Sequence, residues 1–245
     1  MSLKSGSALL VNRGLRPFGL RVVRVSETRP WDADFLQWIE QAKVAGVDPN
    51  DIGDRTWDDD PLEAALQKHY LPHVSSDSRI LELGPGSGRL SRHIIHKCGE
   101  LILVDYSSVV CGWIESYLQG KGKFQVHHIK KPILPMIEDC SVDAVMANGV
   151  FEHIDRDEMY WFLKEFKRVL KPRCPVLFNF NNLISPGGRA HFLRFLPQPG
   201  ERNIFRFYHP ESVAMLAESV GLHVIRIATD DTRFAFAELK TSGTV

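Results

Sequence analysis

The amino-acid sequence predicts an α/β protein built on a mainly parallel, seven-stranded sheet with helices on both faces. From residue 79 onward, short apolar runs typical of strands alternate with segments of helical periodicity. Such alternation indicates parallel strands whose connecting helices cover the sheet. The 245 residues fit a single domain of this kind with an appendage, and no internal repeat interrupts the pattern.

Seven apolar runs are the expected strands. The first, RILEL, leads into a glycine-rich turn, and the last two follow a helix near the C-terminus. In chain order the predicted strands are residues 79–83, 100–105, 124–129, 142–147, 175–180, 222–227 and 234–239.

The segments between these strands carry helix signals. The clearest helix begins after Asp155, a residue type that favours the N-cap position, and ends near Pro172. Its apolar residues fall at helical spacing: Met159, Phe162, Leu163, Phe166 and Leu170. The other predicted helices run from Arg89 to near Gly99, over 108–118, and over 210–221, where Pro starts the helix and Gly ends it.

Residues 1–72 are expected to be an N-terminal extension of a domain that spans residues 73–245. Within the extension, residues 8–25 suggest a hairpin, and helices are predicted at about 32–45 and 61–71. Residues 181–209 are predicted to be one long irregular stretch. Loops of that length in compact domains are usually functional, so we expect this stretch, together with the N-terminal helices, to select the substrate.

Composition excludes several classes of function. Thirty basic and thirty acidic residues balance to zero net charge, which gives no overall reason to expect nucleic acid or a membrane surface as a partner. No apolar run approaches the roughly 18 residues that a membrane helix needs, and no signal peptide is recognisable. Four widely spaced cysteines and scattered histidines indicate neither disulfides nor a metal site. We therefore expect a soluble cytoplasmic protein, monomeric or homodimeric.

Residues 82–88, Glu-Leu-Gly-Pro-Gly-Ser-Gly, form a glycine loop after the first strand. Glycine lets the backbone turn tightly and approach a ligand closely, and this turn lies at the edge of the sheet where open α/β folds bind ligands. The dinucleotide pattern Gly-x-Gly-x-x-Gly fails because Arg89 stands where its third glycine belongs, and there is no Gly-Lys-Ser/Thr of a P-loop. The loop therefore predicts a nucleotide-type ligand that is not a dinucleotide.

Asp105 ends the second predicted strand, beside the glycine loop in a parallel sheet. A carboxylate at that position can accept hydrogen bonds from both ribose hydroxyls of an adenosine. The combination of loop and carboxylate predicts an adenosine-containing ligand.

The chain resembles the class I, Rossmann-like S-adenosylmethionine-dependent methyltransferases, of the group that modifies small molecules. The resemblance lies in Glu82–Gly88, LVDYS (103–107), SVDAVMANGVFEHI (141–154), the LKP at 170–172 and the C-terminal pattern over 205–227. It implies methyl transfer from S-adenosylmethionine, with S-adenosylhomocysteine as product, to the O, N or C atom of a small molecule.

The resemblance also implies the residues that hold the cofactor. Glycine-loop residues would pack against its methionine and ribose portions, Asp105 would hold the ribose, and Tyr106 would lie beside the adenine. Adenine contact after the third strand would use the backbone or side chain of Ile129. The implied cofactor-binding residues are Glu82, Gly84, Pro85, Gly86, Ser87, Gly88, Asp105, Tyr106, Ile129, Asn148, Gly149 and Phe151.

Catalysis needs a base only where the acceptor atom carries a proton at neutral pH. His153, just beyond the fourth strand, is the candidate base, and Glu152 is the alternative. The basic stretch 181–209 is either a solvated basic loop or a site for an anionic or sugar-linked acceptor, because arginine suits carboxylate and phosphate. The candidate substrate residues there are Arg189, His191, Arg206 and Tyr208.

Two other functions are compatible with the sequence. One is a non-catalytic regulatory protein that keeps the cofactor fold. The other is a different nucleotide-using enzyme with a Rossmann-like sheet.

Overall fold

The computed structural model describes residues 31–51, 62–199 and 204–243. The hairpin predicted at 8–25 lies outside these residues. Helix α2 (Trp31–Val44) confirms the helix predicted at 32–45. The helix predicted at 61–71 consists of three short turns: α3 (Leu62–Ala65), a π-helical turn η3 (Leu66–Tyr70) and a 3-10 turn η4 (Leu71–His73). A further 3-10 turn, η2, covers Pro49–Asp51.

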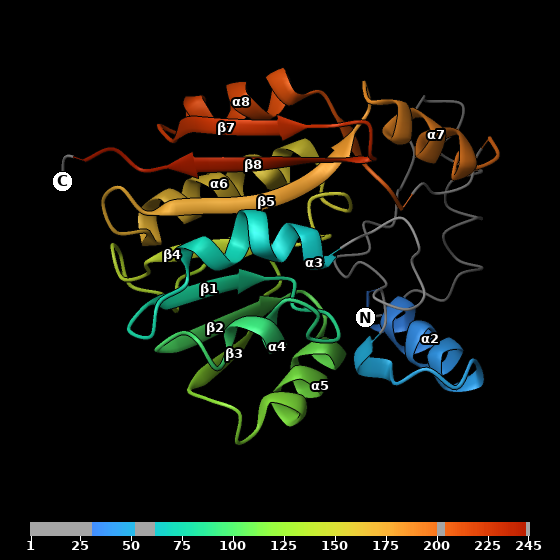
Figure 1. Cartoon of the computed structure of the whole chain (residues 1–245), viewed down its shortest axis with the longest axis horizontal. Helices are drawn as coiled ribbons and strands as arrows, with labels where there is room; N and C mark the ends of the chain where they lie inside the picture. Colours follow the sequence, from blue (N-terminus) through green and yellow to red (C-terminus); the bar gives the residue numbers. More distant parts are fainter. Residues whose placement is uncertain (1–30, 52–61, 200–203, 244–245) are drawn as a thin grey trace, which may run out of the picture. The chain divides into compact units, whose positions relative to one another are not determined.

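The sheet has the predicted α/β character, with strand order β3-β2-β1-β4-β5-β8-β7 (Figure 1). Strands β1 to β5 pair in parallel, whereas β8 runs antiparallel to both β5 and β7. The bounds are β1 Arg79–Leu83, β2 Glu100–Asp105, β3 Phe124–His128, β4 Ala144–Ala147, β5 Pro175–Asn182, β6 Phe207–Tyr208, β7 His223–Thr229 and β8 Phe234–Lys240. Only residues 230–233 join β7 to β8, and so short a connection forces neighbouring strands to be antiparallel.

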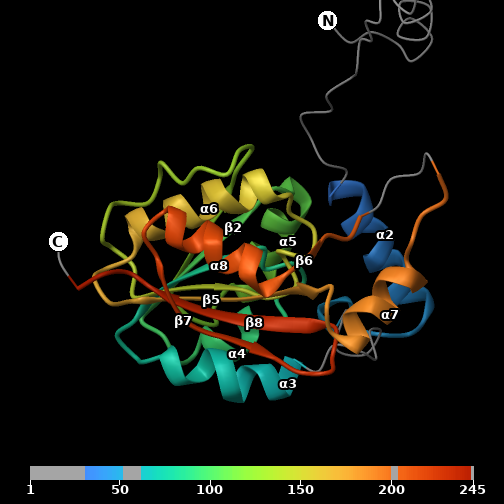
Figure 2. The ribbon, with the colours of Figure 1, turned by 90° about the horizontal axis from the view of Figure 1, so that it is seen from above.

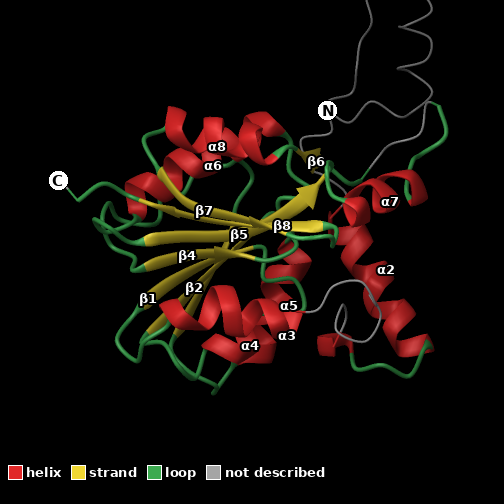
Figure 3. Cartoon of the chain, turned by 45° about the horizontal axis from the view of Figure 1, so that its top comes forward, coloured by secondary structure: helices red, strands yellow, loops and turns green. Residues whose placement is uncertain are grey.

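Helices cover both faces of the sheet, as Figures 2 and 3 show. Helices α6 (Arg156–Val169) and α8 (Pro210–Ser219) pack on one face. Helices α3, α4 (Ser91–Ile94) and α5 (Ser108–Leu118) pack on the other.

Successive side chains of a strand point to opposite faces, and the two cores follow that alternation. In β2, Ile102 and Val104 belong to the α6/α8 core, whereas Leu101 and Leu103 belong to the α3–α5 core. The central strands are therefore apolar at nearly every position, as a sheet buried on both faces requires.

Helix α6 carries the strongest amphipathic pattern among the helices that the structure describes. It buries Met159, Phe162, Leu163, Phe166 and Val169. Asp155 stands at its N-cap, as predicted, but its side chain does not cap the helix and instead accepts a hydrogen bond from Arg206 Nε.

The expectation of an irregular stretch at 181–209 is wrong. Strand β5 continues to Asn182, helix α7 covers Pro186–Arg194, and β6 pairs in parallel with the end of β5. Ser185 Oγ accepts a hydrogen bond from the Gly188 N–H, so Ser185 is the N-cap of a helix whose first residue is Pro186. Ser followed by Pro is a strong helix start, and this signal was present in the sequence.

The helix predicted from Arg89 to Gly99 is shorter than expected. Only Ser91–Ile94 is α-helical, and the Lys97 N–H then bonds back to the Ile94 carbonyl in a tighter, three-residue turn. Among the helices described, none combines the length and the apolar character needed to cross a membrane.

We expect Phe162→Ala to lower the free energy of unfolding by about 3–5 kcal/mol, because Phe162 is fully buried in the α6/α8 core. Trp161→Ala, on the exposed side of the same helix, is the matched control and should change it by less than about 1 kcal/mol. Urea unfolding measures both. Equal losses in the two variants would contradict this assignment of faces.

Candidate functional site

The glycine loop 84–88 turns from β1 into the short helix α4. Gly84, Gly86 and Gly88 all have positive φ, between +53° and +94°. A Cβ on Gly84 would lie 2.5 Å from Val150 Cγ2, and one on Gly88 would lie 2.9 Å from Ile114 Cδ1. A Cβ on Gly86, by contrast, would meet nothing within 4 Å. The loop is therefore pressed against protein at two glycines and presents open backbone at the third.

Glu82 lies beneath the loop and is almost completely buried. Its Oε2 accepts a hydrogen bond of 2.7 Å from Ser91 Oγ in α4. Burial raises the pKa of Glu82 to about 8, although the Ser91 hydrogen bond opposes this shift. Glu82 thus ties the strand before the loop to the helix after it.

Asp105 ends β2 next to the loop, where the Gly84 N–H donates to the Val104 carbonyl at 2.8 Å. Its Oδ1 accepts a hydrogen bond of 2.7 Å from the Ser107 N–H. Burial raises the pKa of Asp105 to about 7, against the opposing backbone hydrogen bonds from Ser107 and Tyr106. The carboxyl group therefore changes charge near neutral pH.

Tyr106 and Ile129, which were predicted to lie beside the adenine, are held in place by contacts within the protein. Tyr106 donates from its hydroxyl to Glu158 Oε1 at 3.3 Å, and its ring meets Phe162 edge-on. The Ile129 side chain is buried in the α6/α8 core, and its N–H donates to the Asp105 carbonyl at 2.9 Å.

The chain after β4 is fixed by residues that the sequence analysis missed. Tyr70, fully buried in the π-helical turn, donates to the Ala147 carbonyl at 3.0 Å and lies 3.3 Å from Asn148 Oδ1. The Gly149 N–H donates to Asn179 Oδ1 on β5 at 2.7 Å. Of Tyr70 and Asn179, only Asn179 has a recognisable signal in the sequence, because it is an amide inside the apolar run of β5.

The prediction that Phe151 lines the cofactor pocket is wrong. Its side chain has no exposed surface and packs on Phe178, with ring centres 4.4 Å apart, and on Phe166. The turn after Gly149 directs this ring into the α6/α8 core rather than toward a ligand.

His153 lies at the far end of the same turn. Its Nδ1 is 3.0 Å from the Ile204 carbonyl, and its ring contacts Trp31 and Phe205. An N–H at Nδ1 would donate to that carbonyl, which leaves Nε2 as an acceptor. Nε2 is 3.9 Å from Glu152 Oε1.

A buried ionic cluster joins this turn to α7 and β8. Arg233 Nη1 donates to Glu152 Oε2 at 3.2 Å and to His191 Nε2 at 2.8 Å, and all three side chains are buried. His191 was predicted to contact substrate, but its ring is enclosed by Arg233, Phe195 and Phe205, so it anchors α7 instead. Arg189 is exposed on the same helix.

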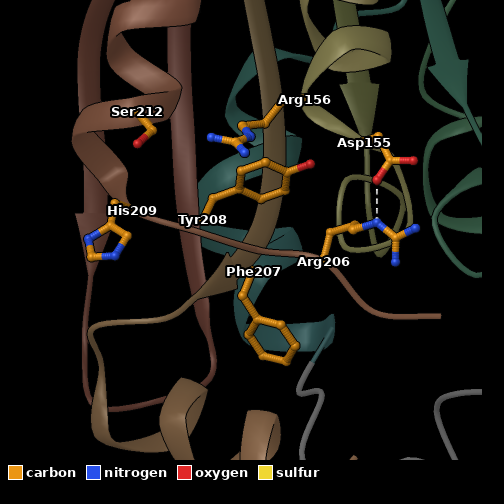
Figure 4. Close-up of a pocket in the computed structure, with 7 residues that line it drawn as sticks. All are labelled: Asp155, Arg156, Arg206, Phe207, Tyr208, His209 and Ser212. Carbon is orange, nitrogen blue, oxygen red and sulfur yellow. Dashed lines mark hydrogen bonds and ion pairs between the residues drawn. The ribbon is translucent and has the colours of Figure 1, made fainter. Parts of the chain in front are cut away.

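A pocket of about 310 Å³ opens between the start of α6, β6 and the start of α8 (Figure 4). It contains two of the four predicted substrate residues, Arg206 and Tyr208. The Tyr208 hydroxyl donates to the Ile154 carbonyl, so the phenol is held as one wall. The lining residues are Asp155, Arg156, Arg206, Phe207, Tyr208, His209 and Ser212.

Comparison with known sequences identifies the central part of the chain. Residues 80–173 match the family described as "Methyltransferase domain". The chain is 30% identical over 125 residues to phosphoethanolamine N-methyltransferase 1 of Arabidopsis thaliana. This match covers 50% of this chain and 25% of the plant protein. It is 27% identical over 172 residues to the ubiquinone/menaquinone biosynthesis C-methyltransferase UbiE of Legionella pneumophila, covering 64% and 66%. The matches therefore span less than two thirds of these relatives.

Solved structures share the fold at lower identity. One is a complex between the Trm112 methyltransferase activator of Haloferax volcanii and a methyltransferase. It superposes on this protein with a TM-score of 0.61 at 20% identity, and the match covers 85% of this chain and 97% of the solved one. An S-adenosylmethionine-dependent methyltransferase from Clostridium acetobutylicum gives 0.59 at 14% identity, covering 86% and 99%.

We expect Glu82→Gln to become more stable relative to the wild type as pH rises. The folded protein holds the Glu82 proton more tightly than the unfolded chain does, so wild-type stability is lost as pH rises from the ordinary glutamate pKa toward about 8. Glutamine has the same shape and cannot ionise. The difference in free energy of unfolding should grow by about 1 kcal/mol or more between pH 5 and pH 8.

Glu115→Gln, on the exposed side of α5, is the control for this experiment and should show no such trend. A difference between Glu82→Gln and wild type that stays constant with pH would refute the assigned pKa.

Proposed function

We propose that this chain, which belongs to the class I S-adenosylmethionine-dependent methyltransferases, transfers a methyl group from S-adenosylmethionine to a small-molecule acceptor. The observation that carries the proposal is the juxtaposition of the positive-φ loop 84–88 with the Asp105 carboxyl at the ends of two paired strands. The loop offers exposed backbone to one part of this cofactor. The Asp105 carboxyl can accept hydrogen bonds from its ribose.

The residues that follow β1, β2, β3 and β4 bind different parts of the cofactor. Asp105 accepts hydrogen bonds from the ribose hydroxyls, and the loop backbone around Gly86 lies against the ligand. Tyr106 and the Ile129 backbone lie toward the adenine. Asn148 and Gly149, fixed by Tyr70 and Asn179, face the methionine end.

The bound sulfonium supplies a methyl carbon already activated for displacement. The protein's main contribution is then to align the acceptor atom and to exclude water, and positioning alone can be worth effective molarities of roughly 10⁵–10⁸ M. Where the acceptor atom carries a proton, His153 takes it at Nε2. The Ile204 carbonyl orients the ring through Nδ1.

The pocket beside α6 supports an anionic acceptor. Arg156 and Arg206 line it together with His209 and Ser212, and Asp155 is its one carboxylate. Guanidinium groups match the geometry of carboxylate and phosphate. Matching relatives from Arabidopsis thaliana and Triticum aestivum are named as phosphoethanolamine N-methyltransferases, which is consistent with a phosphorylated acceptor.

Calorimetric titration tests the cofactor assignment. S-adenosylhomocysteine should bind in preference to NADH, and its affinity should rise about tenfold from pH 6 to pH 8, because the ionised Asp105 carboxylate is the stronger acceptor and its pKa is about 7. Asp105→Asn should bind weakly and lose this pH dependence. Preferential binding of NADH would overturn the proposal, and binding without turnover on any acceptor would indicate a regulatory protein.

Paired acceptors test the anionic class. Phosphoethanolamine should be methylated more efficiently than ethanolamine, and Arg156→Gln should raise the KM for the phosphorylated acceptor by about tenfold or more, the worth of a charge-assisted hydrogen bond. Lys164→Gln, exposed on the same helix, is the control and should leave KM unchanged. Equal methylation of both acceptors, with no effect of Arg156→Gln, would exclude this pocket as the anion site.

A further inference from the structure

Helix α2 is fixed to the adenosine side of the site by one carboxylate. Asp32 Oδ1 accepts hydrogen bonds from Ser107 Oγ at 2.6 Å and from the Val109 N–H at 3.3 Å, and Ser108 Oγ donates to Oδ2 at 3.2 Å. All three donors belong to the start of α5, where a helix favours negative charge. The Ser107 hydrogen bond lowers the pKa of Asp32, so the carboxylate is ionised at neutral pH.

Ser107 also holds the residue that we assign to the ribose. Its N–H donates to Asp105 Oδ1 at 2.7 Å, while its hydroxyl donates to Asp32 and accepts from the Val110 N–H at 3.0 Å. Ser107 is almost completely buried. The Asp105 carboxylate is thus coupled to Asp32 through one residue, Ser107, whose backbone N–H holds Asp105 and whose hydroxyl holds Asp32.

The residue before Asp32 contacts the opposite side of the site. The Trp31 ring meets the His153 ring edge-on, with centres 5.0 Å apart. Adjacent residues are only about 3.8 Å apart along the chain, so the start of α2 reaches from the neighbour of Asp105 to the turn after β4. Figure 3 shows α2 beyond the carboxyl ends of β1, β2 and β4. The glycine loop directly follows β1.

The rest of this segment is anchored outside the site. Phe35, Ile39 and Ala42 bury their side chains with Val110 of α5. Trp113 Nε1 donates to Asn50 Oδ1 at 3.1 Å, and Arg92 Nη1 donates to the Asn50 carbonyl at 2.8 Å. The segment is therefore attached by apolar packing along the middle of α2 and by hydrogen bonds at Asn50, whereas its start is attached by the Trp31 ring contact and the Asp32 hydrogen bonds.

We infer that residues 31–50 form a strap across the cofactor cleft, with Asp32 as a positioning residue that holds Asp105 through Ser107 and limits cofactor release. The inference rests on the proposed function, because it takes the cofactor to lie between Asp105 and the turn after β4. A cofactor there is covered by Trp31 and Asp32, so it leaves when this end of α2 undocks.

Stopped-flow measurement of S-adenosylhomocysteine dissociation tests the strap. Asp32→Asn should raise the dissociation rate about tenfold and raise the KM for S-adenosylmethionine, with little change in kcat or in the melting temperature of the ligand-free protein. Asp34→Asn removes the same charge from the same turn of α2 and should behave as wild type. Equal dissociation rates in wild type, Asp32→Asn and Asp34→Asn would overturn the inference.

A double-mutant cycle tests the route through Ser107. Ser107→Thr keeps the hydroxyl and should release the product as wild type does, whereas Ser107→Ala should release it faster. Adding Asp32→Asn to Ser107→Ala should have less effect than Asp32→Asn has in the wild type, because both changes act on the hydrogen bond between Ser107 and Asp32. Additive effects would show that Asp32 acts elsewhere. Failure of wild type to bind S-adenosylhomocysteine would instead refute the proposed function itself.

Discussion

The candidate site depends on the absence of side-chain atoms at two positions of the glycine loop. Gly84 packs against Val150 after β4, and Gly88 packs against Ile114 on α5, each at a distance that a Cβ would not tolerate. These contacts bring the ends of β1 and β4 and the helix after β2 together around one turn. The same packing keeps Gly86 open, so the constraint that assembles the edge of the sheet also leaves backbone exposed for a ligand.

Sequence reasoning succeeded where local signals determine structure. Strands β1 and β2 and helix α5 have the predicted bounds, because each apolar run ends at polar or glycine-rich residues. Sequence reasoning failed to find the residues that reach the site from distant parts of the chain. Asp32, Tyr70 and Arg233 reach the site only through tertiary packing, and no local pattern marks them. The inward direction of Phe151 likewise depends on the space between α6 and β5.

The ionic cluster of Glu152, Arg233 and His191 places charged groups in a buried region beside the turn after β4. Burying an ion pair costs hydration, and its attraction offsets that cost only where the geometry is good. Such a cluster therefore adds little stability, but it tolerates few alternative arrangements. Its effect here is to fix the turn after β4, α7 and the start of β8 in one relation, which a precisely aligned reaction requires.

The short strand β6 has a consequence for how this fold can change over time. It pairs with Asn181 and Asn182 at the end of β5, so the chain leaves the sheet and rejoins it at the same place. Because closing a longer loop costs only slightly more entropy than closing a shorter one, the intervening segment can vary in length without displacing the sheet. Insertions and deletions there can therefore be accommodated without displacing the loop 84–88 or Asp105, which lie at the ends of other strands.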